Sequence, residues 1–241
     1  MNYAAILAGG TGRRMGGSIP KQFMKLCGVP IIILTIRRVL SVFEFDRLII
    51  AVHPEWEEHL YNLITEYSIV DNRISIIHGG IERLDTVLNV VAAIERNAVI
   101  SDEDCIVIHD AVRPFVSQSI LKNSLEALKQ HDAVVAALPA VDTMLWCDTF
   151  PYVTSMPNRN KLFYGQAPDS FRLKALNRAL SELTEEEKNR SQEQRRFVCS
   201  KVFQSLQFRV INEISRLRLQ KISIMQPFYI MEKMGYEGVC S

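Results

Sequence analysis

YAAILAGGTGRRMGGSIPKQ, residues 3–22, joins an apolar run to a glycine-rich turn. Gly9, Gly10 and Gly12 allow backbone N–H groups to approach phosphate oxygens closely, because a glycine has no Cβ in the way. The positive charge that a polyphosphate needs is supplied by Arg13, Arg14 and Lys21. The stretch predicts a strand that leads into a triphosphate-binding loop, with a plain structural turn as the alternative. Nucleotidyl transfer is the chemistry it suggests.

Two established nucleotide-binding loops do not fit this stretch. A P-loop requires Lys-Ser/Thr directly after its glycines, whereas Lys21 stands well beyond them and behind a proline. The dinucleotide fingerprint Gly-x-Gly-x-x-Gly fails because Met15 follows Gly10 and Gly12 where the third glycine belongs. A nicotinamide-dependent oxidoreductase is therefore disfavoured.

Apolar runs alternate with segments of helical period along the rest of the chain. The expected strands are 3–8, 47–53, 74–78, 105–109 and 132–138. The expected helices are 30–42, 54–67, 84–97 and 117–130, the last with Ser117 as N-cap. Strands this rich in Val, Ile, Ala and Leu predict an α/β fold with a mostly parallel sheet, helices on both faces, and ligands at the carboxyl ends of the strands.

The second half of the chain departs from this alternation. Prolines divide 139–168, which predicts an extended arm that reaches a neighbouring subunit. Residues 172–196 are strongly charged and predict a solvated helix. A strand at 206–211 and an amphipathic helix near 226–235 complete the expected elements.

Composition is that of an ordinary globular protein. The 241 residues, 48% hydrophobic and 23% charged, suffice for one domain over 1–241 with the arm at 139–165 as an appendage. A formal net charge of +1 gives no global attraction to nucleic acid or membranes. Five scattered cysteines without a Cys-x-x-Cys pair indicate neither a disulfide framework nor a zinc site. We expect a cytoplasmic protein with no nucleic-acid or membrane partner.

Two further loops follow predicted strands and carry candidate functional residues. Asp110 and Arg113 emerge after the 105–109 strand, where a carboxylate can hold Mg²⁺; the alternative for Asp110 is the N-cap of a short turn. His109 is expected to be packed rather than catalytic. Gly79-Gly80 followed by Thr86 suits either the reading of a flat base by main-chain groups or a turn with a helix cap.

Several motifs of the chain, and the order in which they occur, resemble those of the cytidylyltransferases that make CDP-linked polyol phosphates. This family contains 2-C-methyl-D-erythritol 4-phosphate cytidylyltransferase and ribitol-5-phosphate cytidylyltransferase. The resemblance covers about residues 3–188, and the combination is closer to the ribitol-phosphate branch. The motifs are LAGGTGRRMG with PKQF, GGIERLDTV, HDAVRPF, Val141-Asp142-Thr143, and Pro157-Asn158-Arg159 leading to Tyr164-Gly165-Gln166-Ala167-Pro168.

This resemblance implies a Rossmann-like fold of the nucleotide-diphospho-sugar transferase type with an extended β-arm, a homodimer formed through that arm, and Mg²⁺ as cofactor. It implies transfer of CMP from CTP to a polyol phosphate, with D-ribitol 5-phosphate favoured and 2-C-methyl-D-erythritol 4-phosphate as the alternative. The implied catalytic residues are Arg14, Lys21 and Arg218. The implied CTP-binding residues are Leu7, Ala8, Gly9, Gly10, Thr11, Gly12, Arg13, Gly80, Arg83, Thr86, Asp110 and Arg113, with Asp110 on the metal. Thr143 and Arg159 would bind the phosphate of the acceptor.

The chain departs from the family pattern in its last third. Ala167-Pro168-Asp169 stands where the family has Thr-Pro-Gln, and Arg218 is the nearest match to a lysine in an Asn-x-Lys-x-Thr segment. An arginine differs from a lysine in reach and geometry. A CTP-binding protein with weak or no turnover is therefore a second hypothesis.

Overall fold

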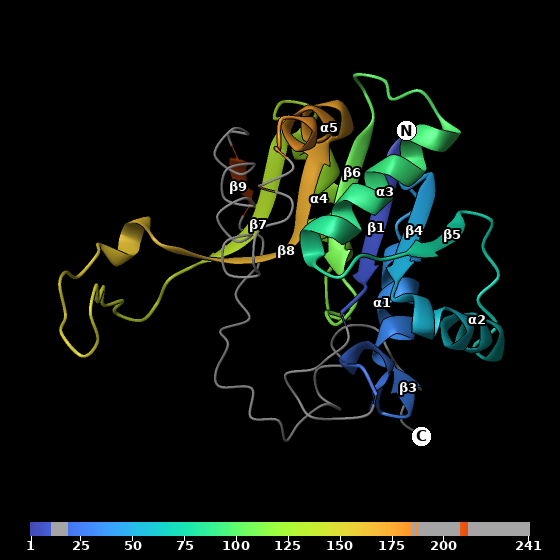
Figure 1. The fold of residues 1–241 in the computed structure, drawn as a ribbon, viewed down its shortest axis with the longest axis horizontal. Coiled ribbons are helices and arrows are strands. Elements are labelled where there is room, and N and C mark those ends of the chain that lie inside the picture. Colours follow the sequence, from blue (N-terminus) through green and yellow to red (C-terminus); the bar gives the residue numbers. More distant parts are fainter. Residues whose placement is uncertain (11–18, 185–186, 188–207, 212–241) are drawn as a thin grey trace.

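The computed structural model describes residues 1–10, 19–184, 187 and 208–211. Within them, seven strands form one sheet in the order β5-β4-β1-β6-β8-β7-β9 (Figure 1). All neighbouring pairs are parallel except those of β8, which runs antiparallel to both β6 and β7. The bounds are β1 Asn2–Ala8, β4 Arg47–Val52, β5 Ile74–His78, β6 Cys105–Asp110, β7 Ala133–Pro139, β8 Phe163–Arg172 and β9 Phe208–Ile211. The mostly parallel α/β sheet predicted from the sequence is confirmed.

Helices cover both faces of this sheet, because alternate residues of the central strand point to opposite sides. Ala4 and Ile6 of β1 join one buried cluster, while Tyr3 and Ala5 join the other. The first cluster is closed by α1 (Ile31–Leu40), α2 (Glu57–Glu66) and α4 (Gln118–Leu128), and the second by α3 (Arg83–Asn97) and α5 (Leu173–Ser181). All five predicted strands of the first half of the chain, and its four helices, are present within a few residues of their expected bounds.

The N-cap predicted for α4 is present. The Ser117 hydroxyl accepts a hydrogen bond from the Ile120 backbone N–H at 3.1 Å. Such a bond satisfies one of the N–H groups that the first turn of a helix leaves without a partner.

The expected arm is shorter at its C-terminal end than 139–168, because β8 already begins at Phe163. Proline is unfavourable inside a strand since it has no N–H to donate. Pro168 is tolerated because the β7–β8 register shifts between Val135 and Ala137, so that the ladder is already interrupted there. The remaining segment, 140–162, projects away from the sheet (Figure 1). It contains the short helix η4 (Arg159–Lys161) and two isolated bridges, Trp146 with Ser155 and Thr149 with Tyr152.

Of the charged stretch 172–196 predicted as a solvated helix, the structure describes α5 at Leu173–Ser181, and most of 185–196 lies outside the described residues. The helix α5 is not solvated on all sides. Its charged residues lie on one side, while Leu176 and Leu180 are buried against the face that α3 covers. The strand expected at 206–211 is confirmed as β9. The helix expected near 226–235 lies outside the described residues.

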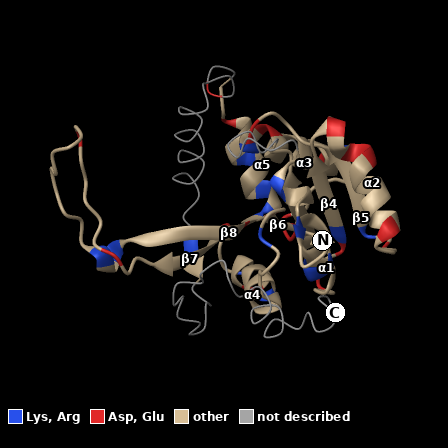
Figure 2. Cartoon of the chain, turned by 90° about the horizontal axis from the view of Figure 1, so that it is seen from below, with Lys and Arg blue, Asp and Glu red and all other residues tan. Residues whose placement is uncertain are grey.

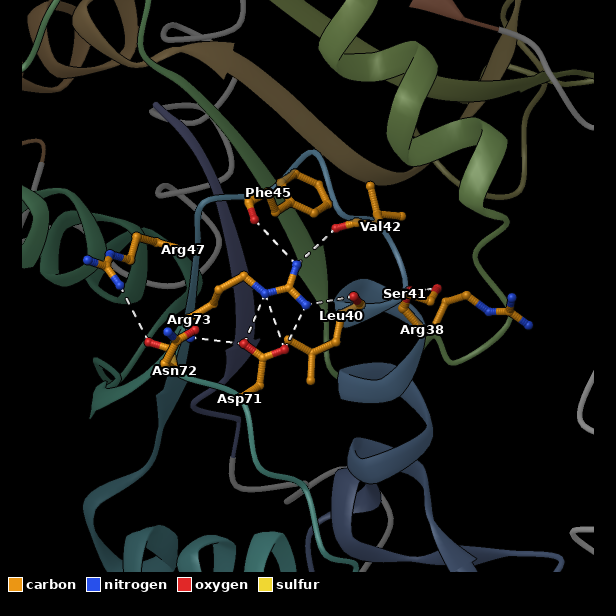
Figure 3. Close-up of polar contacts among 9 residues, drawn as sticks. All are labelled: Arg38, Leu40, Ser41, Val42, Phe45, Arg47, Asp71, Asn72 and Arg73. Atoms are coloured by element: carbon orange, nitrogen blue, oxygen red, sulfur yellow. Dashed lines mark hydrogen bonds and ion pairs between the residues drawn. The ribbon is translucent and has the colours of Figure 1, made fainter.

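A partly buried ion pair between Asp71 and Arg73 fixes the turn after α1 (Figure 3). The Arg73 guanidinium donates to the carbonyl oxygens of Leu40, Val42 and Phe45 at 2.8 to 3.4 Å, and its Nη2 lies 2.7 Å from Asp71 Oδ2. The last carbonyl groups of a helix have no partner within the helix. Arg73 therefore closes the C-terminal end of α1 and ties it to the segment that leads into β5.

Candidate active site

The loops selected from the sequence meet at the carboxyl ends of two parallel strands, β1 and β5, which are separated in the sheet by β4. Gly9 follows β1, and Gly79 and Gly80 follow β5. A Cβ on Gly9 would lie 3.0 Å from Thr86 Oγ1 and 3.2 Å from the Gly80 carbonyl oxygen, and a Cβ on Gly79 would lie 3.1 Å from the Gly9 Cα. Gly9 therefore touches Gly79 and Gly80 through the backbone, and a Cβ on Gly9 or Gly79 would crowd this contact. The structure brings these two loops together, as the sequence predicted.

The Gly79-Gly80 loop continues into α3 through hydrogen bonds typical of a helix start. The Thr86 hydroxyl accepts from the Gly80 N–H and donates to the Glu82 carbonyl oxygen, both at 3.0 Å. Glu82 and Asp85 form a capping box. Thr86 is 2% exposed, so its hydroxyl holds the loop in shape here instead of facing the mouth of the sheet. Of the two alternatives for this loop, these contacts are those of the helix cap.

Four charged side chains and one amide gather where β6 and β8 meet this loop. Arg83 Nη2 lies 3.0 Å from Asp169 Oδ2 and 3.6 Å from Asp110 Oδ1. Arg113 Nε donates to Asp110 Oδ2 at 2.9 Å, and its Nη1 donates to Gln166 Oε1 at 2.8 Å. We call these five residues the charged cluster. Its two carboxylates are balanced by two guanidinium groups, which fixes the direction in which each points.

The two carboxylates of the cluster differ in their surroundings. The Asp110 side chain is 28% exposed, whereas that of Asp169 is 13% exposed. Burial raises the pKa of Asp169, and the negative charge of Asp110 raises it further, against the opposing effect of Arg83. Asp110 is thus the more exposed of the two carboxylates, and Asp169 is the more buried one.

The loop that carries Asp110 and Arg113 is supported from below by two buried side chains. The His109 Nε2 lies 2.9 Å from the Arg113 carbonyl oxygen, so Nε2 carries the proton and donates it. The Thr35 hydroxyl of α1 donates to the Ala111 carbonyl oxygen at 2.9 Å. Burial lowers the pKa of His109, which favours the neutral ring. His109 is packed, as the sequence predicted.

The remaining residues expected at the triphosphate are described in part. Leu7 and Ala8 end β1, Gly10 is exposed, and Lys21 is exposed as the first residue of the 3-10 turn η2 (Lys21–Phe23). The other expected residues lie outside the described part of the chain: Thr11, Gly12, Arg13, Arg14 and Arg218.

The two residues expected at the acceptor lie on the arm. Thr143 and Arg159 are exposed, and the Arg159 guanidinium donates to the Val141 carbonyl oxygen at 3.3 Å. Because the arm projects away from the sheet in both views, a single chain does not bring these residues to the charged cluster (Figures 1 and 2).

Sequence reasoning did not select Asp169 or Gln166 as members of the site. Asp169 is separated from its partner Arg83 by 86 residues, and it lies on a strand whose first half was interpreted as arm. The departure from Thr-Pro-Gln at this position was the signal that could have drawn attention to it.

No three His, Cys, Asp or Glu side chains are grouped closely enough to hold a metal ion by themselves in the described part of the chain. None of the helices described is long and apolar enough to cross a membrane.

Comparison with known proteins gives a family and a fold. The family model of IspD, 2-C-methyl-D-erythritol 4-phosphate cytidylyltransferase, matches residues 3–195. A solved 4-diphosphocytidyl-2C-methyl-D-erythritol synthase from Anaerococcus prevotii is 21% identical, covers 98% of this chain and 97% of its own, and has a TM-score of 0.72. The Francisella tularensis 2-C-methyl-D-erythritol 4-phosphate cytidylyltransferase is 24% identical, with 88% and 89% covered and a TM-score of 0.64. At these identities the solved structures establish the fold, and the family model carries the relationship.

Proposed function

Because this chain belongs to the 2-C-methyl-D-erythritol 4-phosphate cytidylyltransferase family, it is a CTP-dependent nucleotidyltransferase, and we propose that its acceptor is 2-C-methyl-D-erythritol 4-phosphate. The observation that carries this proposal is the match of the family model to residues 3–195, which include the arm and all strands of the sheet except β9. The motifs of the sequence favoured D-ribitol 5-phosphate. The comparisons give that branch no support. We therefore prefer 2-C-methyl-D-erythritol 4-phosphate, which was the alternative acceptor predicted from the sequence.

The reaction is a displacement at phosphorus. A phosphate oxygen of the acceptor attacks the α-phosphorus of CTP. As the new O–P bond forms, the bond between the α-phosphorus and the oxygen that bridges to the β-phosphate breaks. Pyrophosphate leaves with the electron pair of that bond. No side chain forms a covalent bond, so the protein acts by positioning the two substrates and by stabilising the developing negative charge.

The described residues suit these two tasks. The backbone of Gly9 and Gly10 at the end of β1, with Lys21 exposed nearby in the chain, supports binding of the triphosphate. Gly80 and Arg83 border the same mouth and are proposed to face the cytidine, with Thr86 holding Gly80 from behind. Arg14 and Arg218 are proposed to add charge at the triphosphate, and Thr143 and Arg159 to bind the acceptor phosphate.

Asp110 fits the protein side of a magnesium site. It is a partly exposed carboxylate at the carboxyl end of β6 whose present partners are guanidinium groups. Mg²⁺ usually takes one or two carboxylates from a protein and its other ligands from water and substrate phosphates. When bound, the ion would neutralise charge on the triphosphate. One carboxylate at the mouth of the sheet is therefore a sufficient contribution from the protein to such a magnesium site.

We also propose that the arm joins two copies of the chain. Its apolar side chains face solvent in one copy: Trp146 is 59% exposed, Phe150 90% and Tyr152 76%. Exposed apolar surface of this kind marks an interaction site. A second copy would cover these side chains and would also bring Thr143 and Arg159 to a cluster that their own chain does not reach.

The experiment that tests the function is pyrophosphate release from CTP and Mg²⁺ with a panel of acceptors. The panel contains 2-C-methyl-D-erythritol 4-phosphate, D-ribitol 5-phosphate and glycerol 3-phosphate, with the other nucleoside triphosphates as controls. Turnover with the first acceptor alone is expected. A preference for D-ribitol 5-phosphate would overturn the proposed acceptor. Calorimetric CTP binding with no turnover would support the second hypothesis, a CTP-binding protein without activity.

A further inference from the structure

Gln22 is a buried amide directly beside the exposed Lys21. It is 4% exposed, although it lies in the turn that presents the lysine. Its side-chain nitrogen Nε2 donates to the Ala8 carbonyl oxygen at 2.9 Å and to the Gly10 carbonyl oxygen at 2.8 Å. An amide nitrogen carries two hydrogens, so these two bonds use both of them.

The two acceptors of Gln22 are placed where β1 gives way to the glycine-rich segment. Ala8 is the last residue of the strand and pairs with Val52, whereas Gly10 lies beyond the strand. A buried carbonyl oxygen without a partner destabilises the fold, so a bond from Gln22 satisfies Ala8 while it fixes the direction in which the backbone leaves the sheet.

The turn that carries Gln22 is itself anchored. The Phe23 N–H donates to the Pro20 carbonyl oxygen at 2.9 Å. The Phe23 ring, 5% exposed, is stacked on Trp56 with ring centroids 5.0 Å apart. Gln22 and Phe23 therefore point inward while Lys21 faces solvent, so the position of Lys21 depends on its two buried neighbours.

We propose that Gln22 is a positioning residue for the nucleotidyl transfer: it holds the backbone of Ala8 and Gly10 at a fixed separation from Lys21. It touches no substrate and acts through the groups that do. The inference rests on the proposed role of Lys21 at the triphosphate. Within the Pro20–Phe23 motif, Lys21 would act on the triphosphate, and the buried side chains of Gln22 and Phe23 would hold Lys21 in position.

The first test replaces the amide without changing its volume. Gln22→Met keeps an unbranched side chain and removes both donors. Misplacing a catalytic group by a fraction of an ångström to one ångström reduces turnover by about 10- to 100-fold, so we expect kcat/KM for CTP to fall by that order. The KM for the acceptor and the secondary structure should stay unchanged. Gln22→Asn keeps both donors but is one methylene shorter, and it serves the same test if the Met variant does not fold.

Asn2→Leu is the matched control. The Asn2 amide also donates to a carbonyl oxygen, that of Glu44 at 3.0 Å, but at the opposite end of β1. It should lower the melting temperature with no change in kcat/KM for CTP. An equal loss of kcat/KM for CTP in both variants would show that Gln22 is merely structural, and would overturn the proposal.

A double-mutant cycle with Lys21→Ala then isolates the link between the two residues. If Gln22 acts through Lys21, adding Gln22→Met to the Lys21→Ala enzyme should lower kcat/KM for CTP by much less than in the native background. Fully additive losses would refute positioning by Gln22 while leaving the role of Lys21 intact. Unchanged turnover of the Lys21→Ala enzyme alone would instead refute the proposed role of the lysine.

Discussion

Asp110 is the residue on which the proposed magnesium site depends. Arg113 and Arg83 hold its two oxygens at 2.9 and 3.6 Å, and its side chain is still 28% exposed. Asp110→Asn preserves the size of the side chain and its hydrogen bond from Arg113 but removes the charge. We expect turnover to fall by about 100- to 1000-fold and its stimulation by Mg²⁺ to disappear. Pyrophosphate release measured against Mg²⁺ concentration checks this.

Asp102→Asn is the control for that experiment, because Asp102 is 77% exposed and paired with Lys174 instead of the cluster. It should leave both turnover and the Mg²⁺ dependence unchanged. Retained stimulation by Mg²⁺ in the Asp110→Asn enzyme would show that the ion is held elsewhere.

The pair of Asp71 and Arg73 allows a prediction of pH dependence. The hydrogen bond from Arg73 lowers the pKa of Asp71 in the folded chain. The stability it contributes is therefore present above the ordinary carboxyl pKa of about 4 and is lost as pH falls through the lowered value. We expect Asp71→Asn to lower the free energy of unfolding at pH 7 by about 1–3 kcal/mol, as for other hydrogen bonds to charged groups.

Urea unfolding between pH 7 and pH 3 measures this difference. The native and variant curves should converge below about pH 4, where Asp71 gains a proton and the native pair is weakened. Glu126→Gln provides the comparison, since its pair with Lys129 is about 70% exposed and should contribute nothing measurable. A constant difference at all pH values would exclude the ion pair as its source.

At the scale of single residues, the sequence predicted the chemical role of a side chain better than it predicted which residues the side chain contacts. His109 on an apolar strand was expected to be packed, and it is. Asp169 could not be assigned, because its significance comes from Arg83, which is remote in the sequence. Gln22 was noted only as part of the Pro-Lys-Gln motif. No local sequence pattern predicts that its side-chain amide is buried and donates to the carbonyl oxygens of Ala8 and Gly10.

Among the elements, the start of α3 is the most constrained. A Cβ on Gly80 would lie 2.2 Å from the Asp85 Cβ and 2.7 Å from the Asp85 carbonyl carbon, so the first turn of α3 would have to move. We expect Gly80→Ala to lower the free energy of unfolding by about 1–3 kcal/mol, as for other overpacked positions, and to weaken CTP binding. A Cβ on Gly165 would have no neighbour within 4 Å, so Gly165→Ala should have little effect on the free energy of unfolding or on CTP binding.

Urea unfolding and calorimetry with CTP separate these outcomes. Equal stability of the Gly80 and Gly165 variants would mean that the loop relaxes freely, and would remove the geometric reason for a glycine at position 80.

The elements that sequence periodicity predicted are those with one clear hydrophobic pattern. Strands β1, β4 and β6 are buried parallel strands that read as continuous apolar runs, while β5 is a partly exposed edge strand. All four were located within a few residues. β8 was not predicted as a strand, because Pro168 indicates an interruption. The strand continues because its register against β7 shifts there, with residues 166–168 of β8 opposite Ala136 alone.

At the scale of the whole molecule, the arm is the feature that one chain leaves incomplete. Its outer part carries few charged side chains (Figure 2). Its exposed apolar residues include Trp146, Phe150 and Tyr152. Thr143 and Arg159 share the arm with them, and the arm projects away from the sheet in which β6 ends at Asp110 (Figure 1). The sequence predicted the arm from its prolines, but its projection away from the body follows from where β7 and β8 end.

If two copies exchange arms, each active site combines Lys21 of one chain with Arg159 of the other. Lys21→Ala and Arg159→Ala homodimers should then both be nearly inactive, but a mixed dimer should hold one site in which both residues are native. Random exchange in an equal mixture makes half of the dimers mixed, so about a quarter of the native activity should return. The measurement is pyrophosphate release before and after subunit exchange, with exchange itself followed by native mass spectrometry. Full exchange with no recovered activity would place Lys21 and Arg159 in the site of the same chain, and the arm would then have to fold back toward its own sheet when the acceptor binds.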